Sequence, residues 1–328
     1  MRGIVVEDLG GPDSLRLAAV EEPRGAHELA DGARLLVEVH AAGISFPDLL
    51  QSRGEYQYRT PPPFVSGGEV AGVVLEADPG CGFDPGDRVA GMTVWGAMAE
   101  RAQAIPRFTL PLPDSVDFAA GAALYLNYTT AWFAIERAAI EPGEAVLVHG
   151  AAGGVGTAAL QLLALRGARP IAVVSDAGKE EVARRMGASE VLRSDGNWLG
   201  GTRELTDGHG VAVVLDPVGG DRFADSLRAL DTGGRLIVIG FAGGSIPTIK
   251  ANRLLLGNLT VTGIAYDPMD RRFPGTLARI NEAVSGLAAA GRIAPLVGRR
   301  LPFERGAEAL AILDRREAIG KVVVEVAG

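Results

Sequence analysis

The sequence has 328 residues, of which 45 are Gly, roughly twice the usual share. It contains one Cys and four His, and its formal net charge is −8. One Cys and dispersed His exclude an internal disulfide and a Cys-rich or His-paired metal site, and the acidic balance argues against nucleic-acid binding. We therefore expect no metal and no nucleic-acid partner, in a chain of about two domains.

The N-terminus, MRGIVVEDLGG, has acidic residues early and no apolar stretch of signal-peptide length. The longest uncharged stretch covers residues 118–135 and just reaches the length of a membrane span. Polar residues in its middle, among them Asn127 and Thr130, would be costly in lipid. We predict a buried helix here, no membrane association, and a soluble cytoplasmic protein.

Residues 1–117 contain short apolar or alternating runs separated by Pro- and Gly-rich breaks. The runs cover residues 2–6, 15–20, 34–41, 69–77 and 86–91, and the breaks include PPPF at 61–64 and DPGCGFDPGD at 78–87. Strands at this spacing, with so many turn signals, are typical of a barrel-like or antiparallel domain.

Residues 145–264 follow a different pattern, in which fully apolar strands alternate with helices. The predicted strands are 145–149, 171–174, 211–218, 235–240 and 259–264, and the predicted helices are 157–168, 179–188 and 221–230. Strands without polar alternation, separated by helices, indicate a parallel sheet covered on both faces. The pattern predicts a doubly wound α/β domain of the dinucleotide-binding type.

The remaining segment, 270–328, has helical patterns at about 273–290 and 304–314 and a strand, KVVVEV, at 321–326. We expect this strand to return to the N-terminal β-rich domain. The predicted division is a β-rich domain over 1–120, a dinucleotide-binding domain over 121–265, and a C-terminal segment, 266–328, that returns to the first domain.

The sequence His149-Gly-Ala-Ala-Gly-Gly-Val-Gly156 joins a predicted strand to a predicted helix. Ala151 stands where a G-x-G-x-x-G motif has its first Gly. Gly153 still lets the backbone approach a pyrophosphate, Gly156 allows close helix–strand packing, and the helix N-terminus offers N–H groups to phosphate. The alternative is a glycine-rich turn without a ligand. We assign this turn to a dinucleotide, with contacts from Ala152, Gly153, Gly154, Val155 and Gly156.

The end of the second strand of this domain indicates which dinucleotide is bound. NAD sites place an acid there for the ribose 2′-hydroxyl, whereas this strand ends with Val174. Ser175 can donate to a 2′-phosphate and Lys179 can reach it as a cation, although Lys179 can also be a solvated lysine paired with nearby glutamates. Asp176 would repel the phosphate unless it points to solvent. We favour NADP(H) over NAD(H).

Several segments together resemble the medium-chain dehydrogenase/reductase superfamily, and within it the zinc-free quinone oxidoreductases related to zeta-crystallin. The resemblance covers essentially the whole chain. It rests on AAGISFPDLLQSRGEY (41–56), GGEVAGVV (67–74), LNYTTAW (126–132), VLVHGAAGGVGTAALQLL (146–163), VLDPVGGDRF (214–223) and GGRLIVIGFAGG (233–244). It implies an α/β fold, with a Rossmann doubly wound parallel sheet and a β-rich GroES-like barrel domain.

Departures from the zinc alcohol dehydrogenases carry the functional information. Where those enzymes have a catalytic Cys ligand this sequence has Ser45, and where they have the His of Gly-His-Glu it has Gly68. Their four-Cys structural lobe is missing. Because catalytic zinc needs about three protein ligands, alcohol oxidation is not expected, whereas quinones and activated alkenes accept hydride with little activation.

The resemblance also implies the remaining site residues and the assembly. The nicotinamide is expected near Ser45, Thr130, the Gly240-Phe241-Ala242 turn and Ile264-Ala265-Tyr266, and Ser194 falls near a cofactor-phosphate position. Tyr56, Asn127 and Thr130 can donate hydrogen bonds to a developing oxyanion. Each also has a structural alternative, as a surface-loop aromatic, a satisfied core amide and a hydroxyl bonded to its own helix. Relatives pair as homodimers through the edge strand of the nucleotide domain, here 261–266.

The resulting prediction is an NADPH-dependent quinone oxidoreductase that transfers hydride without zinc. Two alternatives stay open at this point. One is an NADPH-dependent reductase of enones or enoyl thioesters on the same scaffold. The other is a protein that holds NADPH without turnover.

Overall fold

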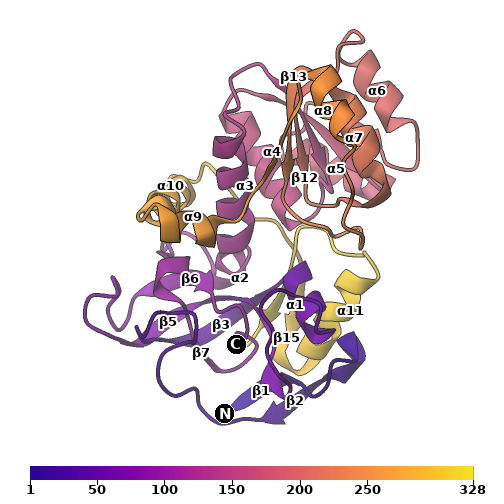
Figure 1. Ribbon diagram of the computed structural model, residues 1–328. Helices are drawn as coiled ribbons and strands as arrows, with labels where there is room; N and C mark the ends of the chain where they lie inside the picture. The colour runs from indigo at the N-terminus through magenta and orange to yellow at the C-terminus, as the bar shows by residue number, and fades with distance from the viewer. Residues whose placement is uncertain (328) are drawn as a thin grey trace. The chain divides into compact units, whose positions relative to one another are not determined.

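The computed structural model describes residues 1–327 and divides into two compact units (Figure 1). Unit 1 comprises Met1–Leu126 and Leu277–Gly328, of which Gly328 lies outside the described residues. Unit 2 comprises Asn127–Thr276 and is one continuous insertion between the two parts of unit 1. The divisions fall after residues 126 and 276, whereas the sequence placed its domain boundaries after 120 and 265.

Unit 1 is built mainly from antiparallel strands. Within the described residues its larger sheet has the order β15-β16-β3-β5-β6-β8, with β7 pairing β3 off this path, and its smaller sheet has the order β2-β1-β4. The strands before residue 126 are β1 (Arg2–Val6), β2 (Leu15–Ala19), β3 (Leu35–Ile44), β4 (Phe64–Val65), β5 (Glu69–Ala77), β6 (Arg88–Met92), β7 (Arg101–Gln103) and β8 (Thr109–Pro111). The helices are η1 (Gly11–Ser14), α1 (Phe46–Ser52), η2 (Pro106–Phe108) and α2 (Phe118–Gly121).

The segment after residue 276 completes the larger sheet of unit 1. It contains α10 (Thr276–Ala289), β15 (Val297–Pro302), η4 (Phe303–Glu308), α11 (Ala309–Asp314) and β16 (Lys321–Glu325). β16 pairs antiparallel with β3, with Val323 opposite Gly43, and β15 pairs parallel with β16. The apolar side chains of β16 are buried in the same core as those of β3 and β5, which is why this apolar run forms a strand here.

Unit 2 holds a parallel sheet with the strand order β11-β10-β9-β12-β13-β14. Its strands are β9 (Ala145–His149), β10 (Arg169–Val174), β11 (Glu190–Arg193), β12 (Val211–Asp216), β13 (Leu230–Val238) and β14 (Thr260–Gly263). Its helices are α3 (Tyr125–Arg137), which begins in unit 1, α4 (Gly154–Leu165), α5 (Ala177–Arg185), α6 (Trp198–Glu204), η3 (Gly220–Arg222), α7 (Phe223–Ala229), α8 (Ala251–Gly257) and α9 (Tyr266–Arg272). Numbered within the unit, the order is 3-2-1-4-5-6, which confirms the predicted doubly wound sheet.

The uncharged stretch 118–135 is not the single helix that the sequence predicts. It forms α2 and α3, which are separated at residues 122–124. A Cβ on Gly121 would lie 2.8 Å from the Leu112 side chain, so the last residue of α2 packs closely against its neighbours in unit 1. The Asp117 carboxylate caps α2 by accepting from the backbone N–H of Ala120 at 2.6 Å. Among residues 1–327, every helix falls short of the length and apolar character that crossing a membrane requires.

Candidate active site

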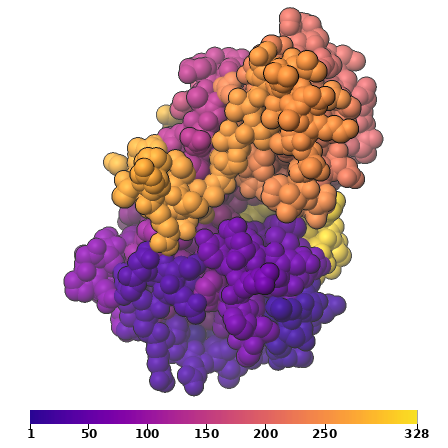
Figure 2. Space-filling view, in the orientation of Figure 1, coloured from indigo at the N-terminus to yellow at the C-terminus, as the bar shows by residue number. Residues whose placement is uncertain are grey.

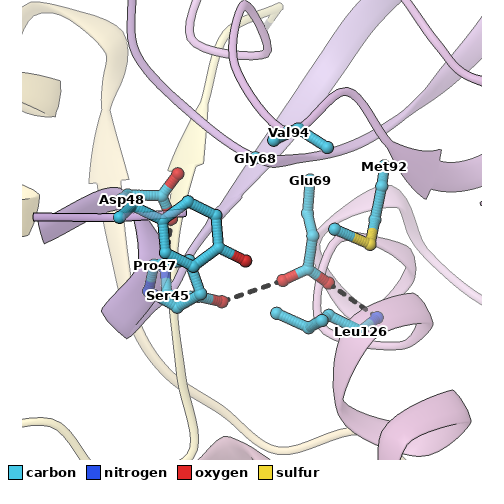
Figure 3. Close-up of a pocket in the computed structure, with 9 residues that line it drawn as sticks. Ser45, Pro47, Asp48, Gly68, Glu69, Met92, Val94 and Leu126 are labelled. Carbon is cyan, nitrogen blue, oxygen red and sulfur yellow. Dashed lines mark hydrogen bonds between the residues drawn. The ribbon is translucent and has the colours of Figure 1, made fainter. Parts of the chain in front are cut away.

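A pocket in unit 1 lies where β3 gives way to α1 and where β5 begins (Figure 3). Nine residues line it, namely Ser45, Pro47, Asp48, Tyr56, Gly68, Glu69, Met92, Val94 and Leu126. The structure thus brings together Ser45 and Tyr56, which the sequence analysis had assigned to the cofactor and the substrate. It adds two buried carboxylates, Asp48 and Glu69, that the sequence analysis did not select.

The start of α1 fixes the first side of this pocket. Ser45 is the N-cap residue of α1, with extended backbone, and Pro47 lies in the first turn, where a missing N–H is tolerated. The backbone N–H of Ser45 donates to Asp48 Oδ2 at 2.6 Å. The Asp48 side chain is buried, and this burial raises its pKa to about 6. The Asp48 carboxylate, which takes part in capping α1, therefore lies inside the protein rather than in solvent.

A buried lysine, Lys321, contacts Ser45. The Lys321 ammonium, on the first residue of β16, donates to Ser45 Oγ and forms an ion pair with the Glu69 carboxylate. The side chains of Lys321 and Glu69 are only 2% and 1% exposed. Burial lowers the pKa of Lys321 to about 7, and the negative charge of Asp48 opposes that shift. Because a buried charge without a partner is strongly unfavourable, Lys321 and Glu69 depend on each other.

Glu69 is the centre of this cluster, because both of its oxygens are engaged. Its Oε2 accepts from Ser45 Oγ at 3.0 Å, and its Oε1 accepts from the backbone N–H of Leu126 at 3.0 Å (Figure 3). The Oε2 atom also pairs with Lys321. Leu126 lies in the first turn of α3, where N–H groups have no partner inside the helix and the helix dipole favours a negative charge. A carboxylate at the start of β5 thereby holds the N-terminus of α3.

The donor set of this pocket does not fit a catalytic zinc ion. Ser45 offers a neutral hydroxyl, Gly68 has no side chain, and Glu69 is committed to Lys321 and Leu126. A catalytic zinc needs about three ligands drawn from Cys, His and carboxylates. Over residues 1–327, three or more His, Cys, Asp or Glu side chains do not gather in a way that could hold a metal ion. The positive charge in this cluster belongs to Lys321.

The three predicted catalytic side chains are divided between the two units. Tyr56 lines the pocket of unit 1, its ring centroid is 5.8 Å from that of Tyr58, and burial raises its pKa to about 12. Its phenol is therefore a proton-bearing hydrogen-bond donor at neutral pH. Asn127 and Thr130 lie on α3 in unit 2, and both are buried.

The glycine turn of unit 2 connects β9 to α4. A Cβ on Gly156 would lie 2.3 Å from the carbonyl oxygen of Gly150, so only Gly permits this contact between the helix and the turn. A Cβ on Gly154 would lie 2.6 Å from Oδ1 of Asn127, which places Asn127 against the turn. At Gly153 the nearest such atom is the Gly150 carbonyl oxygen, at 3.3 Å. The backbone at Gly153 is accordingly the open side of the turn.

The residues assigned to a 2′-phosphate lie together at the carboxyl end of β10. Lys179 Nζ donates to Ser175 Oγ at 2.9 Å and forms an ion pair with Asp176 at 3.2 Å. Asp176, whose charge had been the objection to a phosphate here, caps α5 by accepting from the backbone N–H of Lys179 at 3.1 Å. Val174 and Arg193 are paired at the ends of the neighbouring parallel strands β10 and β11. Ser175 follows Val174 and Ser194 follows Arg193, so the two serines come directly after the same pair.

The later predicted cofactor residues also follow the carboxyl ends of strands. Gly240, Phe241 and Ala242 follow β13, and Ile264, Ala265 and Tyr266 follow β14. The turn after β12 is held by Asp216, a residue that sequence reasoning did not select. Its Oδ1 accepts from the backbone N–H groups of Val218 and Gly219, both at 2.9 Å, and burial raises its pKa. In open parallel sheets, ligands bind outside this edge.

Two sequence profiles match the chain. That of the alcohol dehydrogenase GroES-like domain covers residues 31–114, and that of the zinc-binding dehydrogenases covers residues 154–293. Quinone oxidoreductase-like protein 2 of Bos taurus is 36% identical over 295 residues, which span 88% of this chain and 84% of the relative. Quinone oxidoreductase of Homo sapiens is 30% identical over 337 residues, which span 99% and 97%.

Solved structures give the same result over almost the whole chain. A probable oxidoreductase from Mycobacterium abscessus superposes with a TM-score of 0.89 at 38% identity, covering 99% of each chain. The quinone oxidoreductase of Thermus thermophilus, which was also solved in complex with NADPH, superposes with a TM-score of 0.83 at 33% identity, covering 99% of this chain and all of the other. The chain therefore belongs to the medium-chain dehydrogenase/reductase superfamily of oxidoreductases, among its quinone oxidoreductase-like members.

Proposed function

We propose that the protein is an NADPH-dependent quinone oxidoreductase that works without zinc. The observation that carries this proposal is the buried Lys321 ammonium between Ser45 and Glu69. An internal ammonium there leaves no ligand set for a Lewis acid, and alcohol oxidation in this scaffold would need one. A quinone accepts a hydride without such activation.

The cofactor in this proposal is NADPH, which supplies the hydride when bound. Support comes from the relative solved with NADPH and from the residues at the carboxyl end of β10. Ser175 and Lys179 would face the 2′-phosphate, with Ser194 beside them, and Val174 leaves no acid for a ribose 2′-hydroxyl. The glycine turn, Ala152–Gly156, would hold the pyrophosphate. Ser45, Thr130, Gly240–Ala242 and Ile264–Tyr266 remain the proposed contacts of the nicotinamide half.

The proposed substrate contacts are Tyr56 and Thr130, with Asn127 acting through the cofactor turn. The role of Tyr56 is supported by its place in the lining of the pocket and by its raised pKa, which keeps the phenol protonated at neutral pH. Asn127 lies against Gly154, so its amide can set the position of the turn at which the pyrophosphate would lie. The three side chains then have different effects. Replacing Tyr56 or Thr130 should affect the reaction with the acceptor, whereas replacing Asn127 should affect the affinity for the cofactor.

The test is a screen of cofactor consumption with NADPH and NADH against quinones, enones and enoyl thioesters. We expect rapid oxidation of NADPH by a small quinone and much slower oxidation of NADH. Fast reduction of enoyl thioesters with failure on every quinone would establish the second candidate instead. Quenching of NADPH fluorescence without oxidation by any acceptor would identify a protein that only holds the cofactor.

We also propose a homodimer formed along the β14 edge of the parallel sheet. Ile246, Leu255 and Leu256, the last two on α8, are 78%, 77% and 78% exposed, and β14 is the last strand in the order of the sheet among the described residues. Exposed apolar side chains and an unpaired strand edge each favour a partner. In Figure 2 the segment around residue 250, coloured orange, is at the molecular surface. Light scattering after gel filtration should give twice the chain mass for the wild type and the single chain mass for Leu255→Asp/Leu256→Asp. The control is Leu9→Asp, at an exposed leucine of unit 1. A monomeric wild type would contradict the proposal. The cytoplasmic location stays a prediction.

A further inference from the structure

Reduction of a quinone requires more than a hydride, because an oxygen of the acceptor must also gain a proton. The inference that follows rests on the proposed function and identifies the side chain that delivers this proton. Ser45 lines the pocket, and its hydroxyl donates a hydrogen bond to Glu69 (Figure 3). The same hydroxyl accepts a hydrogen bond from Lys321. Lys321 itself is buried and is not among the residues that line the pocket.

We propose that Ser45 is the catalytic residue that protonates the acceptor oxygen, and that Lys321 is the positioning residue that holds the Ser45 hydroxyl and restores its proton. Only one rotation is needed, in which the Ser45 O–H turns from Glu69 Oε2 toward an acceptor in the pocket. The Lys321 N–H already points at Ser45 Oγ. The chain of donors therefore runs from the buried ammonium through the hydroxyl to the pocket.

Each electron pair and each proton in the reduction has a source and a destination. The acceptor receives a hydride, with two electrons, and one of its oxygens becomes an oxyanion. The O–H bond of Ser45 breaks as a new O–H bond forms on the acceptor. An N–H bond of Lys321 breaks as the proton moves to Ser45 Oγ, which leaves a neutral amine. Solvent then returns one proton to Lys321, so that one hydride from NADPH and one proton are consumed for each quinone reduced to the hydroquinone.

The other titratable groups around Lys321 fit this role less well. Glu69, on β5, accepts the hydrogen bonds of Ser45, Lys321 and Leu126, so it holds the chain in place. Asp48, on α1, is engaged with the backbone N–H of Ser45. Tyr56 has a raised pKa, which suits hydrogen-bond donation better than proton loss. Lys321 has its pKa lowered by burial, which makes release of a proton near neutral pH easier.

The Lys321 side chain packs against Gly43 of β3, and its ammonium contacts Ser45. A Cβ on Gly43 would lie 2.0 Å from the backbone carbonyl oxygen of Ala122 and 2.8 Å from Lys321 Cε, so this position of β3 accepts only Gly, and the lysine side chain lies against it. Gly in a strand interior weakens the strand and is found where another group approaches closely.

The kinetic test compares Ser45→Ala, Lys321→Met and Lys321→Arg with wild type in the NADPH–quinone reaction. Loss of a general acid typically costs roughly 10²–10⁴-fold, so we expect kcat to fall at least tenfold in Ser45→Ala and Lys321→Met, with KM for NADPH unchanged in Lys321→Met. In wild type, kcat should fall as pH rises and Lys321 loses its proton. Lys321→Arg keeps a cation and an N–H donor, and should restore part of kcat while removing this alkaline fall.

The control is Glu325→Gln, on the same strand β16, which removes an exposed pair with Arg300 and should leave kcat and its pH profile unchanged. Unchanged kcat and pH profile in Lys321→Met, with a wild type that reduces quinones, would overturn the proton route and leave the proposed function standing. A wild type that reduces no quinone would instead remove the proposed function.

A second test needs neither cofactor nor turnover. 4-Nitrophenol is an oxyanion mimic whose ionised form has its own absorption band. Added to the protein without NADPH, at a pH below its own pKa, it should bind with its phenolate band enhanced, because Ser45 and Lys321 stabilise the oxyanion. Lys321→Met should lose this enhancement and Glu325→Gln should keep it. A wild-type spectrum equal to that of the free probe would contradict the inference.

Discussion

Asn127 packs directly on the glycine turn, because a Cβ on Gly154 would lie 2.6 Å from its Oδ1 and 2.7 Å from its Nδ2. This contact predicts that Gly154→Ala displaces Asn127, lowers stability by about 1–3 kcal/mol as an overpacked site, and weakens NADPH binding. Titration of NADPH fluorescence measures the affinity. Removing the amide relieves the crowding, so Gly154→Ala/Asn127→Ala should bind NADPH more tightly than Gly154→Ala. Equal affinity of the two variants would show that the contact does not set the turn.

Gly153→Val should abolish NADPH binding while the protein stays folded. The backbone at Gly153 has φ −82° and ψ −178°, which valine adopts easily, and the nearest atom to an added Cβ is 3.3 Å away. The side chain would instead occupy the side at which a pyrophosphate must approach. Thermal unfolding should give a midpoint near that of wild type. By contrast, Gly156→Ala places a Cβ 2.3 Å from the Gly150 carbonyl oxygen and should lower stability by about 1–3 kcal/mol. Normal NADPH affinity in Gly153→Val would refute the assignment of the turn.

Lys179→Ala should weaken NADPH binding roughly tenfold or more and leave NADH binding nearly unchanged. A hydrogen bond to a charged group contributes about 1.5–3 kcal/mol, and only NADPH carries the 2′-phosphate. In the protein without cofactor, Lys179 is held on Ser175 and Asp176, so the ammonium is already at the carboxyl end of β10. Lys179→Arg is the matched control and should keep most of the preference for NADPH. Equal losses for the two cofactors would remove the proposed 2′-phosphate contact.

His149 should make the protein less stable in mild acid. Its ring is fully buried at the end of β9, Nε2 lies 2.8 Å from Ser226 Oγ, and burial lowers its pKa to about 3. Below pH of about 6.5 the unfolded chain takes up a proton that the folded chain does not, so stability is lost as pH falls from about 6.5 toward 3. The slope is about 1.4 kcal/mol per pH unit for one such group.

Urea unfolding at several pH values between 7 and 4 measures this effect. His149→Gln should flatten the dependence, leaving a smaller contribution from His27, whose pKa is lowered by burial to about 4. His209 is exposed, so His209→Gln should behave as wild type. A His149→Gln variant with an unchanged slope would show that His149 becomes protonated within the fold.

Sequence reasoning predicted the parallel sheet of unit 2 well because its signals are local. The run 145–149 matches β9 residue for residue, and Gly156 is required by its close contact with Gly150 in the same turn. The 118–135 stretch was predicted as one helix but forms two, and Gly121, the last residue of the first, packs closely against Leu112 and Ala71. Such packing has no local pattern.

The buried cluster at Ser45 was missed for a related reason. A charged residue at the first position of an apolar strand, such as Glu69 or Lys321, is ordinarily a solvated strand end. Their pairing joins residues 252 positions apart, which one sequence cannot show. One signal was present, because Gly43 lies inside a strand, where a Gly marks a close approach by another group. At Asp176, the sequence was interpreted only for its charge, although Asp before a helix is also a capping residue.

The pairing of β16 with β3 also sets an order of assembly during synthesis. Ser45 and Lys321 are 276 residues apart, and a ribosome adding about 5–20 residues per second takes roughly 14–55 seconds to cover that distance. Unit 2 is a continuous stretch of chain and can complete its parallel sheet within that interval. Until β16 emerges, β3 has an open edge and Glu69 has no counter-charge. The nascent chain thus carries a finished nucleotide domain beside an unfinished catalytic one, and it is the second that needs protection from aggregation.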